Sequence, residues 1–217
     1  MRARGSLFTL TGWDLVWLAL SMTVILIILF ADPVAAQQSA GRISALTGQA
    51  TVSHAGRQTA AAPGTPLRGG DRIVTGNGTR VQIAFASGDS AVIGESSEVV
   101  LRHFKAAPDG GRDGWLELLE GILRVVLRPG PDTSVEVSTR TAIASVRSTE
   151  WVVEALPMTT GVLAISGTVT VTSRATISQV VLNPGEGTDV AATGDPSDAK
   201  RWGAARIESA LARTRQP

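Results

Sequence analysis

The stretch Thr141–Val153 reads Thr-Ala-Ile-Ala-Ser-Val-Arg-Ser-Thr-Glu-Trp-Val-Val and indicates a β fold. Its Thr, Ile and Val side chains are β-branched, and such residues suit a pleated, half-buried surface better than a helix. Arg147-Ser148-Thr149 interrupts the apolar run at its middle. A bulge or sharp bend at this step would let the chain turn a corner and re-enter the core with Trp151. We therefore predict a strand pair with a bend between its two strands.

Short strand patterns also lie on both sides of this stretch. Val81, Ile83 and Phe85 alternate with polar or small residues, which predicts a strand with one buried face. Glycine, proline and aspartate gather between the apolar runs, as they do in tight turns. The pattern predicts one all-β domain of about a dozen short strands, wound as a β-solenoid-like roll or a rolled β-sandwich. A jelly roll is the alternative.

The segment 115–127 also partly fits a helix. The residues that partly fit a helical stripe are Leu116, Leu118, Leu119, Leu123 and Val126. Gly121 interrupts this stripe, and the Val125-Val126 pair favours strands. We predict strands on both sides of Gly121.

The C-terminal segment 195–215 differs from the rest and predicts a helix. Asp195 precedes Pro196, which suits an N-cap followed by the first helical position, and Asp198 would favour the helix dipole. The apolar stripe is narrow. It comprises Gly203, Ile207, Ala210, Leu211 and Thr214. We expect this helix to pack on the sheet; the alternative is attachment to an acidic membrane surface or a partner protein.

Composition limits the class of protein. The chain has 217 residues, 43% of them apolar and 18% charged, with 23 glycines. This fits one globular domain and not a disordered chain. A net charge of +1 argues against nucleic-acid binding, which usually requires a concentrated basic face. Because cysteine is absent, disulfides and thiolate metal sites are excluded.

Residues 1–36 have the features of an export segment. Arg2 and Arg4 precede an apolar run over 15–30, and Val34-Ala35-Ala36 supplies small residues before Gln37. Cleavage there would release the domain into the periplasm. Two alternatives remain: the run is close to the length that spans a bilayer, which suits an uncleaved anchor, and it also fits a buried core helix.

Several motifs in order resemble the FecR domain, a periplasmic module named after bacterial iron-uptake regulators. The resemblance covers Gly41 to about Val190. Its motifs are Gly70–Gly76 (Gly-Asp-Arg-Ile-Val-Thr-Gly), Val146–Trp151 (Val-Arg-Ser-Thr-Glu-Trp), Gly167–Val171 (Gly-Thr-Val-Thr-Val) and Leu182–Glu186 (Leu-Asn-Pro-Gly-Glu). Ser148 stands where the family has glycine, and Gly88-Asp89-Ser90 replaces its Asp-Gly-Ser order.

The resemblance implies an envelope location and a binding role. The family's best-known members carry an anti-sigma domain before this module, but about 14 residues precede the apolar run here, too few for a folded domain. We therefore expect a stand-alone exported FecR domain without anti-sigma activity. It would lie in the periplasm, or remain anchored to the inner membrane through residues 15–30.

Residues that could carry chemistry are scattered. Neither His54 nor His103 has a second metal ligand at helical spacing. We therefore predict that both are solvated residues at strand ends and not ligands of a zinc ion. Asp71, Asp89 and Asp132 lie in turns, where aspartate caps the backbone. We predict no catalytic residue, metal or cofactor.

One group could form an interaction surface: Arg147, Thr149 and Trp151, with Trp115 as a further aromatic. Residues two apart on a strand share a face, so the first three would point the same way unless a bulge intervenes. In the structural interpretation Trp151 fills the edge of the core, with the Arg147 stem over it. In the functional one Trp151 stacks on a ligand.

These observations favour a non-enzymatic envelope protein with an interaction or sensing domain, in one form a signal relay. The alternative is a binding module for peptidoglycan or another envelope carbohydrate, which needs an exposed aromatic platform. The expected partner is therefore an envelope protein or a cell-envelope glycan, and not nucleic acid.

Overall fold

The computed structural model describes residues 39–146 and 150–217, which contain 17 strands and one helix. The strands are β1 (Gly41–Thr47), β2 (Ala50–His54), β3 (Arg57–Ala60), β4 (Pro66–Leu67), β5 (Asp71–Thr75), β6 (Arg80–Phe85), β7 (Ser90–Ile93), β8 (Glu98–Ala106), β9 (Arg112–Val126), β10 (Thr133–Ser138), β11 (Ala142–Val146), β12 (Glu150–Ala155), β13 (Thr159–Ser166), β14 (Val169–Ser173), β15 (Gln179–Leu182), β16 (Glu186–Ala191) and β17 (Lys200–Arg201). The helix α2 comprises Ala204–Arg213. The predicted all-β class with a C-terminal helix is confirmed.

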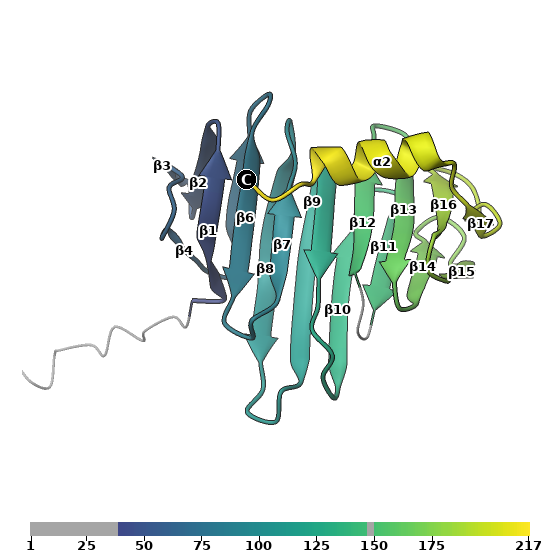
Figure 1. The fold of residues 1–217 in the computed structure, drawn as a ribbon, viewed down its shortest axis with the longest axis horizontal. Helices are drawn as coiled ribbons and strands as arrows, with labels where there is room; N and C mark the ends of the chain where they lie inside the picture. Colours follow the sequence, from purple (N-terminus) through teal and green to yellow (C-terminus); the bar gives the residue numbers. More distant parts are fainter. Residues whose placement is uncertain (1–38, 147–149) are drawn as a thin grey trace, which may run out of the picture. The chain divides into compact units, whose positions relative to one another are not determined.

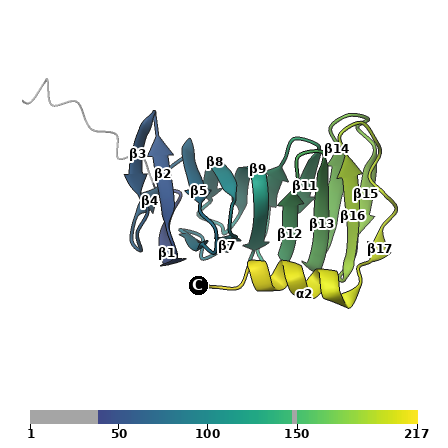
Figure 2. The ribbon, with the colours of Figure 1, turned by 90° about the horizontal axis from the view of Figure 1, so that it is seen from above.

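All 17 strands belong to one hydrogen-bonded mixed sheet that folds into two layers (Figures 1 and 2). Layer A contains, in order, β4, β1, β6, β7, the second half of β9, β12, β13, β16 and β17. Layer B contains β3, β2, β5, β8, the first half of β9, β10, β11, β14 and β15. The pairing of β9 with β10 is parallel and the other pairings are antiparallel.

Strand β9 joins the two layers. Its residues 112–120 pair in layer B, and its residues from Gly121 onward pair in layer A. Gly121 has φ +93°, and a Cβ at this position would overlap the Ser97 side chain. Glycine therefore makes the change of layer, because it alone adopts this conformation easily and leaves room for Ser97. The predicted strands on both sides of Gly121 are confirmed.

The stretch Thr141–Val153 also passes from one layer to the other. Strand β11 pairs with β10 and β14 in layer B, whereas β12 pairs with β9 and β13 in layer A. The two predicted strands are present, one in each layer. They do not pair with each other, however. The predicted bend at Arg147-Ser148-Thr149 lies outside the described residues.

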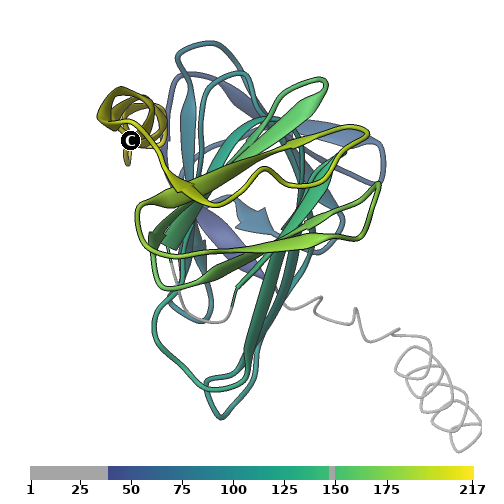
Figure 3. The same cartoon turned by 90° about the vertical axis from the view of Figure 1, so that its right-hand side faces the viewer.

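The inner faces of both layers enclose one apolar core (Figure 3). Alternation places every second strand residue inside, as at Ile73 in β5 or Ile83 in β6, both fully buried. A second, smaller apolar cluster lies between the outer face of layer A and α2. It comprises Ile122, Val152, Leu163, Trp202 and Ala210.

The C-terminal helix begins at Ala204, so the predicted start at Asp195 is wrong. The Asp195 carboxylate instead accepts a hydrogen bond from Ser178 Oγ at 2.6 Å. Hydrogen bonds from the Ser178 and Thr176 hydroxyls hold the pKa of Asp195 below its usual value. Pro196 forms a bridge with Val190, so this segment runs extended beside β16. Among the described residues, no helix is long and apolar enough to span a membrane.

Candidate functional site

Trp115 lies on the outer side of layer B, at the centre of its row of strands. Its neighbours Gly114 and Leu116 on β9 are buried, whereas Trp115 keeps 41% of its surface exposed. The indole Nε1 donates a hydrogen bond to Ser138 Oγ at 2.8 Å, and the Arg102 Cζ atom lies 5.8 Å from the ring centroid. Both contacts hold the ring in one position, so little side-chain entropy would be lost on binding.

A polar strip extends from Trp115 across three neighbouring strands. The strand register places Glu136 of β10 beside Trp115, Ser145 of β11 beside Glu136, and Thr170 of β14 beside Ser145. Ser145 Oγ donates to Glu136 Oε1 at 3.3 Å. Hydroxyl and carboxylate groups on successive strands therefore form a row of donors and acceptors next to an aromatic ring.

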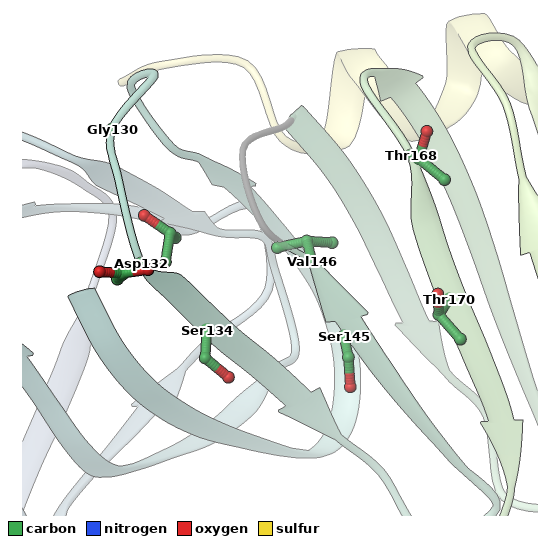
Figure 4. Close-up of a pocket in the computed structure, with 8 residues that line it drawn as sticks. Gly130, Asp132, Ser134, Ser145, Val146, Thr168 and Thr170 are labelled. Atoms are coloured by element: carbon green, nitrogen blue, oxygen red, sulfur yellow. The ribbon is translucent and has the colours of Figure 1, made fainter. Parts of the chain in front are cut away.

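The far part of this strip forms an open hollow of about 670 Å³ (Figure 4). Its lining comes from β10, β11, β14 and the two turns before β10 and β14. The lining residues are Gly130, Asp132, Thr133, Ser134, Ser145, Val146, Thr168 and Thr170. They offer hydroxyls and one carboxylate, with no cationic group among them. The hollow can therefore donate and accept hydrogen bonds.

The two tryptophans of the predicted interaction surface, Trp151 and Trp115, lie in different environments. Trp151 is fully buried in the core, with no exposed surface. It therefore cannot stack on a ligand, which is a correction to the functional interpretation and agrees with the structural one. Trp115 lies on the outer side of layer B, so the two rings form no common platform. The predicted roles of Arg147 and Thr149 lie outside the described residues.

Two of the three aspartates predicted to cap the backbone, Asp71 and Asp89, accept hydrogen bonds from backbone N–H groups. Asp71 Oδ2 accepts a hydrogen bond from the Arg68 N–H at 2.7 Å, and Asp89 Oδ1 accepts one from the Arg128 N–H at 2.8 Å. The structure adds a buried ion pair that the sequence did not indicate. Arg112 Nε lies 2.6 Å from Asp89 Oδ2, although its N–H is not aligned for a hydrogen bond. Arg112 also lines an open pocket of about 350 Å³ beside the β8–β9 turn.

Both histidines pair with carboxylates. His54 Nδ1 lies 2.5 Å from Asp71 Oδ1, and His103 Nε2 lies 3.2 Å from Asp113 Oδ2. The His54 pair connects two neighbouring strands, which the sequence could not show because it depends on the register of β2 and β5. Within the described residues, no three His, Cys, Asp or Glu side chains are close enough to hold a metal ion.

Comparison with known proteins identifies the family of the central part of the chain. The model of the FecR protein family matches residues 71–170. Residues 71–170 of this chain are a FecR domain. The matched segment runs from the start of β5 into β14 and contains Trp115 and the polar strip. It is narrower than the range from Gly41 to about Val190 that the motifs predicted. No curated protein sequence matches the chain.

Solved structures share the fold. Two crystal structures of a "putative anti-sigma factor" from Parabacteroides distasonis ATCC 8503, at 1.65 Å and 2.50 Å resolution, each match with a TM-score of 0.53 and 20% sequence identity. The match covers 64% of this chain and 64% or 63% of theirs, so the alignment spans just under two thirds of those proteins. A "cell surface anchoring domain" is 36% identical over 29% of this chain and 84% of its own, with a TM-score of 0.28, too low to indicate a shared fold.

Proposed function

We propose that the protein is a non-enzymatic bacterial envelope protein whose FecR domain binds a partner protein through the outer face of layer B, as an interaction or sensing module. The supporting observation is the exposed, immobilised Trp115 at the centre of the matched segment, next to the polar strip. Tryptophan and arginine are the residues that most often dominate the energy of protein interfaces.

The proposed location is the periplasm, because the arginines, apolar run and small residues of segment 1–36 suit export. Retention at the inner membrane through residues 15–30 is the alternative. Signal relay is one form of this function, in which the partner would transmit an envelope signal.

Site-specific cross-linking in the native envelope tests the proposal. A photoreactive residue at Ser134 lies in the hollow of the polar strip, and one at Arg42 lies on the exposed part of layer A. We expect a discrete protein adduct from position 134 and none from position 42. The substitution Trp115→Ala should remove that adduct while the protein remains folded. Adducts that persist in Trp115→Ala would contradict the proposal.

A second function is supported by the same ring. An exposed tryptophan beside rows of hydroxyls and a carboxylate also suits a carbohydrate, whose apolar face stacks on aromatic rings. The proposed alternative is a binding module for peptidoglycan or another envelope glycan. Sedimentation of the purified protein with insoluble peptidoglycan distinguishes the two. A protein-binding module should stay in the supernatant. A glycan-binding module should sediment with the peptidoglycan, and its Trp115→Ala variant should stay in the supernatant.

A further inference from the structure

A second pocket lies at the opposite end of layer B from the polar strip, around the β2–β3 hairpin. His54 ends β2 and Arg57 begins β3, and the two residues face each other across the turn Ala55-Gly56. Both turn residues have positive φ, +47° and +81°, which is typical of a tight two-residue hairpin turn. The turn therefore places an imidazole and a guanidinium side by side on adjacent strands.

The carboxylate of Asp71 holds His54 in position. Its side chain is only 4% exposed, and it lies at the start of β5, the strand that pairs with β2. Asp71 Oδ1 lies 2.5 Å from His54 Nδ1, while Asp71 Oδ2 accepts the Arg68 N–H. Since both oxygens of Asp71 act as acceptors, His54 Nδ1 donates its proton to Oδ1, and this hydrogen bond fixes the orientation of the imidazole ring.

The lining of this pocket carries an excess of positive charge. His54, Arg57 and Arg68 line it together with one carboxylate, that of Asp71, which is already committed to His54 and the backbone. Arg57 and Arg68 are exposed and take part in none of the ion pairs among residues 39–146 and 150–217. Two guanidinium groups without a partner, beside an oriented imidazole, form a favourable environment for an anion.

The size of the pocket points to a ligand larger than a simple ion. Its volume is about 440 Å³, within the range of small-molecule sites. Besides the charged groups, the lining has three apolar residues and two hydroxyls: Val52, Ala55, Pro66, Thr59 and Thr65. We propose that this pocket binds the oxyanion of a small organic ligand, a carboxylate or a phosphate group, with the guanidinium groups of Arg57 and Arg68 as its donors and the ring of His54, held by Asp71, beside it. This site shares no residue with the Trp115 surface and goes beyond the proposed function.

Nitrogen NMR of the histidine rings tests the site directly. The chain has two histidines, so the signals of His54 are assigned by comparison with His54→Gln. Full-length protein is titrated with glucuronate, with inorganic phosphate and with glucose as the uncharged analogue of glucuronate. We expect saturable shifts of the His54 ring signals with an anion, at a Kd of about 1 mM or tighter, and no shift of His103. Preference for glucuronate assigns a carboxylate ligand, and preference for phosphate assigns a phosphate ligand.

Substitutions of the arginines provide the second readout. Arg57→Gln and Arg68→Gln should each weaken binding about tenfold, because each removes a charged hydrogen bond. Arg72→Gln is the matched control, since Arg72 lies next to Asp71 on β5 but pairs with Glu98. The proposal is overturned if no anion shifts the His54 signals, if glucose shifts them equally, or if the Arg72 control weakens binding as much as the two lining arginines do.

Discussion

The outer faces of the two layers each carry a tryptophan beside an arginine, and they differ in what covers the ring. On layer A, Trp202 is 6% exposed, and the Arg206 Cζ atom lies 3.4 Å from its ring centroid. On layer B, Trp115 is 41% exposed, and Arg102 is 5.8 Å away. Among residues 39–146 and 150–217, the helix α2 covers Trp202, and no element covers Trp115 in the same way. Aromatic surface that is held in place and left open is typical of a binding face.

The two rings also rest on different surfaces. Trp202 packs directly on the backbone of layer A, because Gly187 and Gly161 leave no side chain beneath it. Arg206 holds α2 to the sheet by donating to both oxygens of Asp189, at 2.8 and 2.5 Å. This pairing raises the pKa of the Arg206 guanidinium above its usual value. Trp115 instead lies on the outer side of β9, the side that also carries Asp113 and Glu117, with Arg102 near its ring. Removal of the Trp115 ring should therefore leave the core intact.

The largest effect is expected from Trp202→Ala. Removing the ring that joins α2 to layer A should lower the free energy of unfolding by about 3 kcal/mol. Denaturant titration measures this loss, and hydrogen exchange should show faster exchange in residues 204–213. If α2 kept its protection in the variant, the helix would be held by its ion pairs and not by the tryptophan.

The next effect is expected from Gly187→Ala. A Cβ there would overlap the Trp202 ring, so the ring must move away and we expect a loss of about 2 kcal/mol. Gly194→Ala is the matched control, because the nearest atom to its Cβ would be the Ala191 side chain at 4.0 Å. Equal denaturation midpoints for the two variants would show that close packing on Gly187 is unimportant.

A smaller loss is expected from Arg206→Gln. The Arg206 and Asp189 side chains are 39% and 33% exposed, so the ion pair is partly screened by water, and with the stacking on Trp202 it should contribute about 1 kcal/mol. Thermal unfolding at low and high salt measures it. The difference between wild type and variant should shrink in high salt, and a constant difference would assign the effect to stacking alone.

The smallest effect on stability is expected from Trp115→Ala. Because the ring lies on the outer side of β9, next to Ser138, Arg102 and His103, the free energy of unfolding should change by less than about 0.5 kcal/mol. Binding of the partner should nevertheless be lost. A large destabilisation in denaturant would mean that Trp115 is a structural residue, and the contrast with Trp202 would disappear.

Local pattern was enough to predict the strands but not their partners. The alternation through Val81, Ile83 and Phe85 and the turn residues around Asp71 indicated strands that the structure contains. The change of layer at Gly121 and the division of β11 from β12 depend on pairings between distant segments, which periodicity does not contain. The helix was placed too early because Asp195-Pro196 is a good local start signal, whereas tertiary pairing with Val190 keeps this segment extended.

The sequence predicted one residue of the candidate site, Trp115, but not the polar strip of Glu136, Ser145 and Thr170 next to it. Trp115 was predicted as a further aromatic of the interaction surface, but nothing in its local sequence distinguishes it from Trp151, which is fully buried. The difference arises from which side of its strand each ring occupies. The His54–Asp71 pair was missed for a related reason: 17 residues separate the two, and only the pairing of β2 with β5 brings them together.

The course of β9 has a consequence for how this architecture could be lengthened or shortened. Strands before β9 lie on one side of it in both layers, and strands after it lie on the other side. Additional strands could therefore be added at the outer edges of the two layers without changing the central strand β9. The outermost strands are short, two residues each in β4 and β17 and four each in β3 and β15. Margins this short offer few backbone groups to a neighbouring molecule, which limits edge-to-edge aggregation.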